Sequence, residues 1–291
     1  MVLSVKIYLG YDTKNVLNEI KKLPKNSNLN FDILEIMKVR RSDEIEHYNK
    51  EIRFLHDNGY LKYEDNKILI YDSFDDYVKL MEIYVRLLDS LNYVYKLYSN
   101  SILVIVLNAI YVKFSIEKKI IQTFIDNALS TICLGINHFL IDGGSNVKYK
   151  HEILTRDVLK LLETYGESTV AFKQLMKEYS KSLDNNDSFV REINDLRDSY
   201  VAHKDINFYV GDKFRNINIE KAVALFNKLA NKIVDLIKYV SGKEHNINKE
   251  LNQVKVDTLI SLNQLFDKDG EKHVFLDFIM KDEEMLKSIG L

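Results

Sequence analysis

Phe-Val-Arg-Glu-Ile-Asn-Asp-Leu-Arg-Asp-Ser-Tyr-Val-Ala-His-Lys-Asp is the sequence of residues 189–205. Apolar residues and one histidine recur in it at alternating spacings of four and three, which is the pattern of one face of an amphipathic helix. The pattern therefore predicts a helix that directs a histidine to the face where a leucine would be ordinary, with Arg197 at the edge of that face. The residues on the face are Phe189, Ile193, Leu196, Tyr200 and His203.

The pair formed by Arg197 and His203 suits chemistry at a phosphodiester. An imidazole titrates near neutral pH, so it can take up or release a proton under ordinary conditions. An arginine stays charged and presents a planar set of donors that matches a phosphate. The spacing is also compatible with a core histidine that is hydrogen-bonded to a backbone carbonyl, beside a solvated arginine, and this alternative stays open.

The second half of the stretch resembles a known motif. Residues 196–205, Leu-Arg-Asp-Ser-Tyr-Val-Ala-His-Lys-Asp, are similar to the R-x(4–6)-H signature of HEPN domains. The similarity is to the form "LR-(N/D)-x-x-(V/I)-A-H-x-D" of bacterial abortive-infection HEPN proteins, in which a polar residue, here Asp198, follows the arginine. The resemblance implies a mainly α fold: a HEPN-like up-and-down helical bundle over residues 73–245.

The resemblance also implies an activity, metal-independent endoribonucleolytic cleavage in an antiphage abortive-infection or toxin effector. His203 would act as general acid or base, Arg197 would stabilise charge on the phosphate, and Asp198 would orient one of them. Ser199, Tyr200 and Lys204 would contact RNA. The implied partners are RNA, a second copy of the chain joined through the motif helices, and an antitoxin or other regulatory protein. No cofactor is implied.

A second segment carries part of the same resemblance and one departure from it. Residues 126–142, followed by 154–162, look like the first HEPN helix and the short segment after it. The family often has an arginine where Asn137 or His138 stands in this sequence. His138 either replaces that arginine or is a helix-end histidine bonded locally. The departure keeps a second hypothesis open: a non-catalytic HEPN-like module, with a winged helix, that binds nucleic acid or a partner protein.

The composition indicates a mostly helical chain. Among 291 residues there are ten glycines and one proline, which break helices, and 46% are hydrophobic, enough to bury a core. The formal net charge is −2, so any binding of nucleic acid has to rest on a local basic patch. The sequence has no motif spacing typical of a P-loop, a zinc protease or a Cys/His metal site, and we expect no metal.

Cysteine content and hydropathy bear on the compartment. Cys133 is the only cysteine, so an internal disulfide is excluded and a reducing environment is favoured. The first residues lack the apolar core of a signal peptide. The strongest apolar run, 102–112, is far shorter than the roughly 20 residues that span a membrane. We therefore expect a cytoplasmic protein that does not enter a membrane.

The first 72 residues are predicted to form a small winged-helix-like α+β domain. A first helix is expected over 31–36 and a second over 46–57, ended by Asn58-Gly59. The segments 60–63 and 68–71 then read as a β-hairpin with a turn at 64–67. On the second helix, His47, Lys50 and Arg53 are candidates to contact DNA or a partner, and the interleaved acidic residues make DNA the less favoured of the two.

The rest of the chain shows helical periodicity. Helices are predicted over 74–98, 101–114, 117–141, 168–182 and 219–241, the last closing the bundle after the motif. Residues 246–291 form a C-terminal extension with two more amphipathic helices, which pack on the bundle or on a partner. The predicted organisation is therefore 1–72, 73–245 and 246–291.

Overall fold

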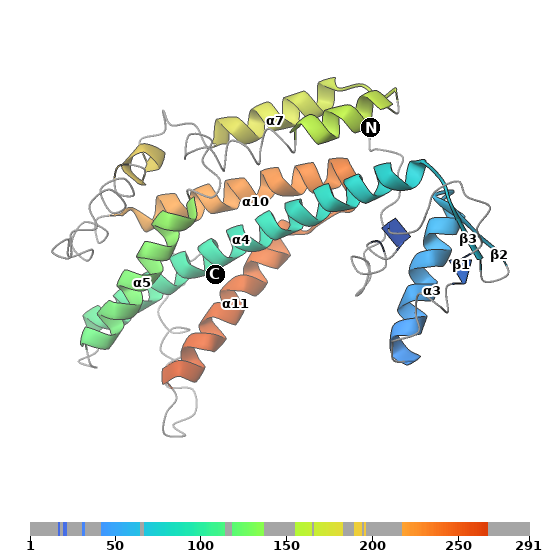
Figure 1. Cartoon of the computed structure of the whole chain (residues 1–291). Coiled ribbons are helices and arrows are strands. Elements are labelled where there is room, and N and C mark those ends of the chain that lie inside the picture. Colours follow the sequence, from blue (N-terminus) through green and yellow to red (C-terminus); the bar gives the residue numbers. More distant parts are fainter. Residues whose placement is uncertain are drawn as a thin grey trace. The chain divides into compact units, whose positions relative to one another are not determined.

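The structure is a computed structural model of the whole chain (Figure 1). The described residues are 17, 20–21, 31–32, 42–64, 67–113, 118–136, 155–164, 166–182, 189–193, 195 and 217–266.

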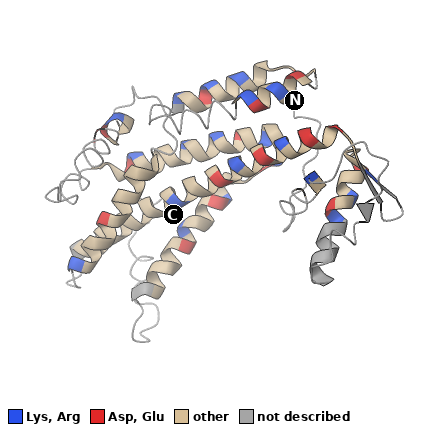
Figure 2. Cartoon of the chain, in the orientation of Figure 1, with Lys and Arg blue, Asp and Glu red and all other residues tan. Residues whose placement is uncertain are grey.

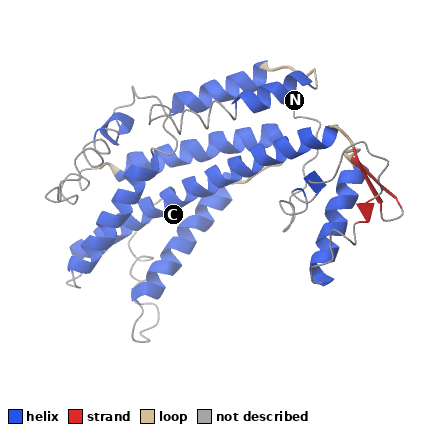
Figure 3. Cartoon of the chain, viewed as in Figure 1, coloured by secondary structure: helices blue, strands red, loops and turns tan. Residues whose placement is uncertain are grey.

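Helices make up most of this described part, as predicted from the low content of glycine and proline (Figure 3). Residues 155–164 and the start of the motif stretch are helical as well. The bounds of α10 coincide with the prediction, and α5 and α7 lie inside the predicted ranges. The labelled helices are α3 (Ser42–Asp57), α4 (Ser73–Lys113), α5 (Lys118–Ile136), α7 (Val170–Ser182), α10 (Ile219–Ser241) and α11 (Ile247–Phe266).

A small antiparallel sheet lies next to α3, which contacts β2. Strands β2 (Leu61–Glu64) and β3 (Lys67–Ile70) pair as a hairpin, which confirms the predicted hairpin, with each strand lying one residue closer to the turn than predicted. Strand β1 (Phe31–Asp32) pairs with the other edge of β3, giving the order β1-β3-β2. The predicted helix over 31–36 is therefore wrong at its first two residues. Phe31 pairs with Ile68, and this pairing between distant segments overrides the local pattern.

Gly59, two residues after the end of α3, caps the helix. The Gly59 N–H donates to His56 O at 3.0 Å, and the Tyr60 N–H donates to Leu55 O at 2.9 Å, which is the Schellman pattern. Gly59 has φ of 75°, a left-handed conformation that a side chain disfavours. The Asn58 amide also donates to Phe54 O at 2.8 Å. These bonds satisfy the last carbonyls of α3 and turn the chain into the hairpin.

Helix α4 is one element of 41 residues, or about 60 Å at 1.5 Å per residue. The predicted break between 98 and 101 is wrong, because the polar residues there bond within the helix. The Asn100 amide donates to Lys96 O at 2.8 Å, and the Ser101 hydroxyl donates to Leu97 O at 3.0 Å. Polar side chains that bond the carbonyl four residues earlier are compatible with a continuous helix.

Helix α4 is apolar over a longer stretch than residues 102–112. By length and composition, Ser73–Tyr111 meets the criterion for crossing a membrane, with a mean hydropathy of 1.3 over its most apolar window. Half of that window is buried inside the protein, and the core helix of a soluble protein meets the same criterion. The run 102–112 alone underestimated the length of the apolar helix, because it is one part of α4.

The chain forms two compact units that interleave along the sequence. The first comprises Met1–Leu87, Arg156–Thr169 and Ile237–Lys243, and the second comprises Leu88–Thr155, Val170–Leu236 and Glu244–Leu291. Helices α4 and α10 each contribute residues to both units. The predicted boundaries near 72 and 245 stay predictions.

In the first unit, Tyr77 at the start of α4 joins the helix to the hairpin region. Its ring lies 4.5 Å from the ring of Tyr60 and 6.1 Å from that of Phe54, between centroids, and it is fully buried. The Ser73 hydroxyl donates to Gly59 O at 3.3 Å, which ties the first turn of α4 to the end of α3. The end of α3 and the residues that follow it are therefore packed against the first turns of α4.

In the second unit, α4 and α5 approach closely at a glycine. A Cβ added to Gly135 in α5 would lie 2.3 Å from Leu97 Cδ2 in α4. Leu97 is fully buried, so there is little room for it to move. Gly135 is thus the residue that lets α5 lie against α4 at this level.

Candidate functional site

The residues singled out as the catalytic and RNA-binding site lie outside the described part of the chain, and so do Asn137 and His138. Their predicted roles therefore stay predictions. The site residues are Arg197, Asp198, Ser199, Tyr200, His203 and Lys204.

The structure does describe the segment that leads into the motif. Residues 189–193 and Asp195 are helical, as predicted. Phe189, Val190 and Ile193 expose at most 3% of their surface, while Arg191 and Asp195 are exposed. Two members of the predicted stripe, Phe189 and Ile193, are thus confirmed on the buried face, and the helix has an apolar side and a polar side in the predicted phase.

The start of this helix lies near α5 within the second unit. Cys133 in α5 is 1% exposed, and burial raises the pKa of its thiol to about 12, with a further contribution from the negative charge of Glu192. An electrostatic effect of this kind requires the carboxylate to be near the thiol. At neutral pH Cys133 is therefore a protonated, buried side chain and not a nucleophile.

The structure describes α3, which carries the basic residues predicted to contact DNA or a protein partner. His47, Lys50 and Arg53 all belong to this helix, and the side chains of Lys50 and Arg53 are exposed. Glu51 is 1% exposed, so this acidic residue does not share the solvent face with them. Elsewhere, Figure 2 shows basic and acidic residues interleaved along the described helices.

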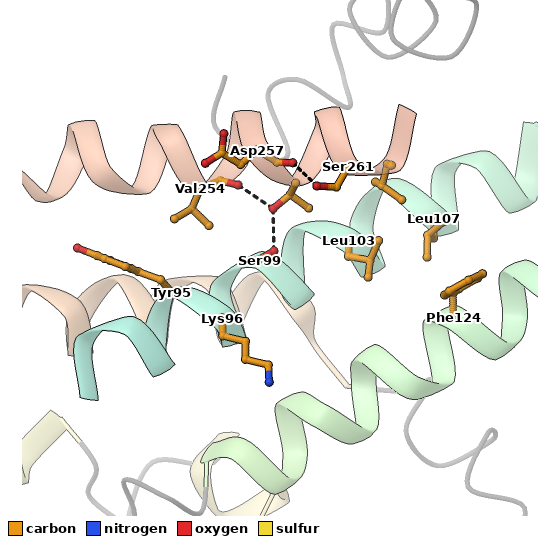
Figure 4. A pocket seen from close by; sticks show the side chains of 11 residues that line it. Tyr95, Lys96, Ser99, Leu103, Leu107, Phe124, Val254, Asp257 and Ser261 are labelled. Atoms are coloured by element: carbon orange, nitrogen blue, oxygen red, sulfur yellow. Dashed lines mark hydrogen bonds between the residues drawn. The ribbon is translucent and has the colours of Figure 1, made fainter. Parts of the chain in front are cut away.

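A pocket in the second unit was not predicted from the sequence. It has a volume of about 450 Å³ and lies where α4, α5 and α11 meet (Figure 4). In that view, α5 and α11 flank α4 on opposite sides. Most of the lining is apolar. The lining residues are Tyr95, Lys96, Ser99, Leu103, Leu107, Phe124, Val254, Asp257, Thr258, Ser261 and Leu262.

A line of polar contacts joins α4 to α11 along one wall of this pocket. Ser99 Oγ lies 2.7 Å from Thr258 Oγ1, and the Tyr95 hydroxyl donates to a carboxylate oxygen of Glu250. The other oxygen of Glu250 lies 3.1 Å from Nδ1 of His245. In the sequence, these residues are polar residues on otherwise apolar helix faces. That pattern does not show which of them contact one another.

The tyrosine in this line is not poised for acid–base chemistry. Burial raises the pKa of Tyr95 far above its ordinary value, and the hydrogen bond and charge of Glu250 raise it further. The phenol therefore keeps its proton at neutral pH, and it donates that proton to a fixed partner. Such buried polar contacts set the register between two helices, and we assign the line that structural role.

The described residues include no group of three or more histidine, cysteine, aspartate or glutamate side chains placed to hold a metal ion. Comparison with models of known protein families, with curated proteins and with solved structures found no match to this chain.

Proposed function

We propose that the protein is a metal-independent endoribonuclease of HEPN type. The observation that carries the proposal is the string Leu196–Asp205, which continues the helical stripe whose described members Phe189 and Ile193 are buried. A mainly helical scaffold, with a helix at 219–241 after the motif, is the setting that a HEPN bundle requires. The proposed bundle extends over residues 73–245.

The proposed chemistry needs two side chains. His203 moves a proton at the ribose 2′-hydroxyl or at the leaving oxygen, and Arg197 offsets the charge that develops on the phosphate. Asp198 fixes the orientation of one of them. The products are a 2′,3′-cyclic phosphate, or the phosphate that its hydrolysis gives, and a free hydroxyl. Ser199, Tyr200 and Lys204 hold the RNA.

The proposed active form is a homodimer. On a helix that continues in phase with Phe189 and Ile193, His203 falls on the side that faces a protein neighbour rather than bulk solvent. Two motif helices that face each other would then form the groove in which RNA is cut. As a nuclease of this type the protein would act in the cytoplasm as a toxin or antiphage effector, restrained by an antitoxin or another regulator.

The first 72 residues are proposed to be a winged-helix-like domain. In support, α3 is followed by the hairpin β2–β3, and β1 pairs with the outer edge of β3. Lys50 and Arg53 are exposed on α3, so this helix supplies the contact surface to a protein partner or, less favoured, to DNA.

The test is RNA cleavage in the presence of EDTA by wild type, Arg197→Ala and His203→Ala, with folding checked by circular dichroism. Arg191→Ala is the matched control, because Arg191 is an exposed arginine on the same helix outside the motif. The proposal expects cleavage by wild type and Arg191→Ala only. Cleavage by all four proteins would contradict the assignment of the site.

A second candidate is the non-catalytic module, which the departure from the family pattern at Asn137 and His138 favours. In that case His203 is structural, and His203→Ala lowers the free energy of unfolding by about 1–3 kcal/mol through a lost buried hydrogen bond. None of the four proteins then cleaves RNA. A folded and equally stable His203→Ala without activity favours the nuclease.

A further inference from the structure

Three lysines follow one solvent-exposed face of α7 (Figure 2). Lys173, Lys177 and Lys181 are spaced four residues apart, and all three side chains are exposed. At about 100° and 1.5 Å per residue, they fall within an arc of about 80° and stand about 6 Å apart along the helix axis. These three residues form the lysine row, a regular line of positive charge in a chain whose formal net charge is −2.

The charge of the lysine row is not cancelled by its own helix. Glu178 is the one acidic residue of α7, and it is bound to α10, because the Lys232 ammonium donates to it at 2.8 Å. That hydrogen bond is the largest cause that lowers the pKa of Glu178, and the charge of Lys181 is the smallest. Within the part of the chain that the structure describes, no residue forms a salt bridge with a lysine of the row.

The neighbouring part of α10 does not cancel the charge either. Lys228 and Asp235 lie about one turn on either side of Lys232. Lys228 is exposed, whereas Asp235 lies 3.6 Å from the Lys232 ammonium, which also binds Glu178. Both carboxylates near this contact are therefore shared with Lys232. Together with the lysine row, this part of α7 and α10 carries five lysines and two carboxylates, an excess of positive charge.

We propose that the lysine row binds the phosphate backbone of single-stranded RNA, an inference that rests on the proposed nuclease function. Phosphates along an extended single strand recur at about the spacing of these lysines, so one strand can contact all three of them. Lysine offers a phosphate a point charge, and contacts of this kind position a nucleic acid without reading its sequence. The lysine row would therefore hold RNA of any sequence.

The place of α7 in the chain keeps the lysine row near the motif stretch. Ser182, the last residue of α7, and Phe189, the first residue of the motif stretch, are seven residues apart and belong to the same compact unit. Their Cα atoms are therefore at most about 25 Å apart, since an extended chain spans no more than about 3.6 Å per residue. A strand bound along the lysine row is thus within a few nucleotides of the start of the motif stretch.

The opposite face of α7 favours RNA over an anionic membrane as the partner. An amphipathic helix binds a membrane by burying its apolar face among the lipids. The apolar face of α7 is already buried inside the protein, through Phe172, Met176 and Tyr179. Val170, which is 72% exposed, is the one large apolar side chain among the exposed residues of α7. The solvent face of α7 therefore suits a hydrated polyanion.

The test measures how strongly salt weakens the binding of RNA to the full chain. The probe is a short fluorescent RNA with 2′-O-methyl riboses, which has no 2′-hydroxyl to attack a phosphate and therefore stays intact. Its dissociation constant is followed by fluorescence anisotropy from about 50 to 200 mM salt. The lysine-row variant combines Lys173→Gln, Lys177→Gln and Lys181→Gln, since glutamine and lysine have similar helix propensities.

Two further variants serve as controls. The first combines Lys96→Gln, Lys119→Gln and Lys249→Gln, which removes the same charge at exposed positions of α4, α5 and α11. The second replaces each lysine of the row by arginine, which keeps the charge. Circular dichroism checks that every variant is folded.

We expect the salt dependence to fall in the lysine-row variant alone. Each phosphate contact contributes about 0.7 to the slope of log K against log salt for a single strand, so the loss of three contacts lowers the slope by about 2. Between about 50 and 200 mM salt, wild type then loses about 20-fold more affinity than the lysine-row variant. The two control variants keep the wild-type slope.

An unchanged slope in the lysine-row variant would overturn the proposal, as would an equal fall in the lysine-to-glutamine control or a wild type that does not bind the probe. Vesicles of phosphatidylcholine and phosphatidylserine test the membrane. Binding to these vesicles that the lysine-row variant loses, together with an unchanged slope for RNA, would make a membrane the partner instead.

Cleavage of ordinary RNA separates this proposal from the nuclease itself. If both are right, the lysine-row variant has a raised KM and an unchanged kcat, because phosphate contacts outside the reacting centre hold substrate and transition state equally. A slope that falls as expected, without any cleavage by wild type, refutes the nuclease and keeps the lysine row as an RNA-binding surface. Cleavage by wild type with an unchanged slope refutes the lysine row and leaves the nuclease standing.

Discussion

Gly135→Ala tests the close approach of α4 and α5. The new methyl group would lie 2.3 Å from Leu97 Cδ2 and 3.0 Å from Leu97 Cδ1. Both contacts are shorter than van der Waals separation, and Leu97 is fully buried in α4. The substitution therefore forces Leu97 from its rotamer or moves the two helices apart.

The magnitude follows from two opposing effects. Overpacking of a buried site costs about 1–3 kcal/mol, while replacing glycine by alanine inside a helix stabilises it by about 1 kcal/mol. The net effect is a loss of about 0–2 kcal/mol in the free energy of unfolding. Leu97→Ala alone leaves a cavity and costs about 2–5 kcal/mol. In the double variant the new methyl group enters that cavity, so the two losses add to less than their sum by about 1–2 kcal/mol.

The assay is urea unfolding followed by circular dichroism for the two single variants and the double variant. The difference between Asn127→Gly and Asn127→Ala, at an exposed position of α5, measures the helix propensity effect without packing. If Gly135→Ala stabilises the protein by that same amount, and the double variant is additive, the reasoning about α4 and α5 is refuted.

Three further predictions concern single residues. Gly59→Ala should cost about 1–2 kcal/mol on urea unfolding, because φ of 75° disfavours a side chain although a Cβ there would have no neighbour within 4 Å. Cys133 should react with a thiol reagent at the rate of unfolding, because its thiol is buried and its pKa is raised; rapid reaction of the native protein contradicts this burial. The hydrogen bond from Lys232, 2.8 Å long, lowers the pKa of Glu178, so the pair stabilises the fold above the unfolded pKa of about 4.5 and this contribution is lost as the pH falls through the lower folded value. Glu178→Gln should then melt at a lower temperature than wild type above pH 5, and this difference should shrink as the pH falls below about 4.5, whereas a difference independent of pH would contradict the pairing.

Local signals predicted much of the fold. The apolar stripe of α10 and the turn of the β2–β3 hairpin are encoded within short windows. Helix α10 lies where its pattern placed it, and the hairpin strands lie within one residue of theirs. The predicted secondary structure was wrong where a contact with another residue, and not the local pattern, decides the conformation. Phe31 is extended because β3 offers it an edge, and Ser101 continues α4 because its hydroxyl bonds Leu97 O.

In the candidate site, too, one feature was predicted from a local pattern and another was not. The stripe through Phe189 and Ile193 was predicted from its period, and both are buried. The pocket was not predicted, because it joins α4 to α11 across more than 150 residues of sequence, and a contact such as that between Ser99 and Thr258 leaves no local pattern. The roles of Arg197 and His203 rest on the motif alone.

The most direct test of the central claim is the chemical nature of the ends produced when the purified protein is incubated with RNA in EDTA. We predict fragments that carry a 2′,3′-cyclic phosphate or its hydrolysis product, formed by wild type and Arg191→Ala but not by His203→Ala. Intact RNA with folded wild type, or cleavage that His203→Ala leaves unchanged, would contradict it.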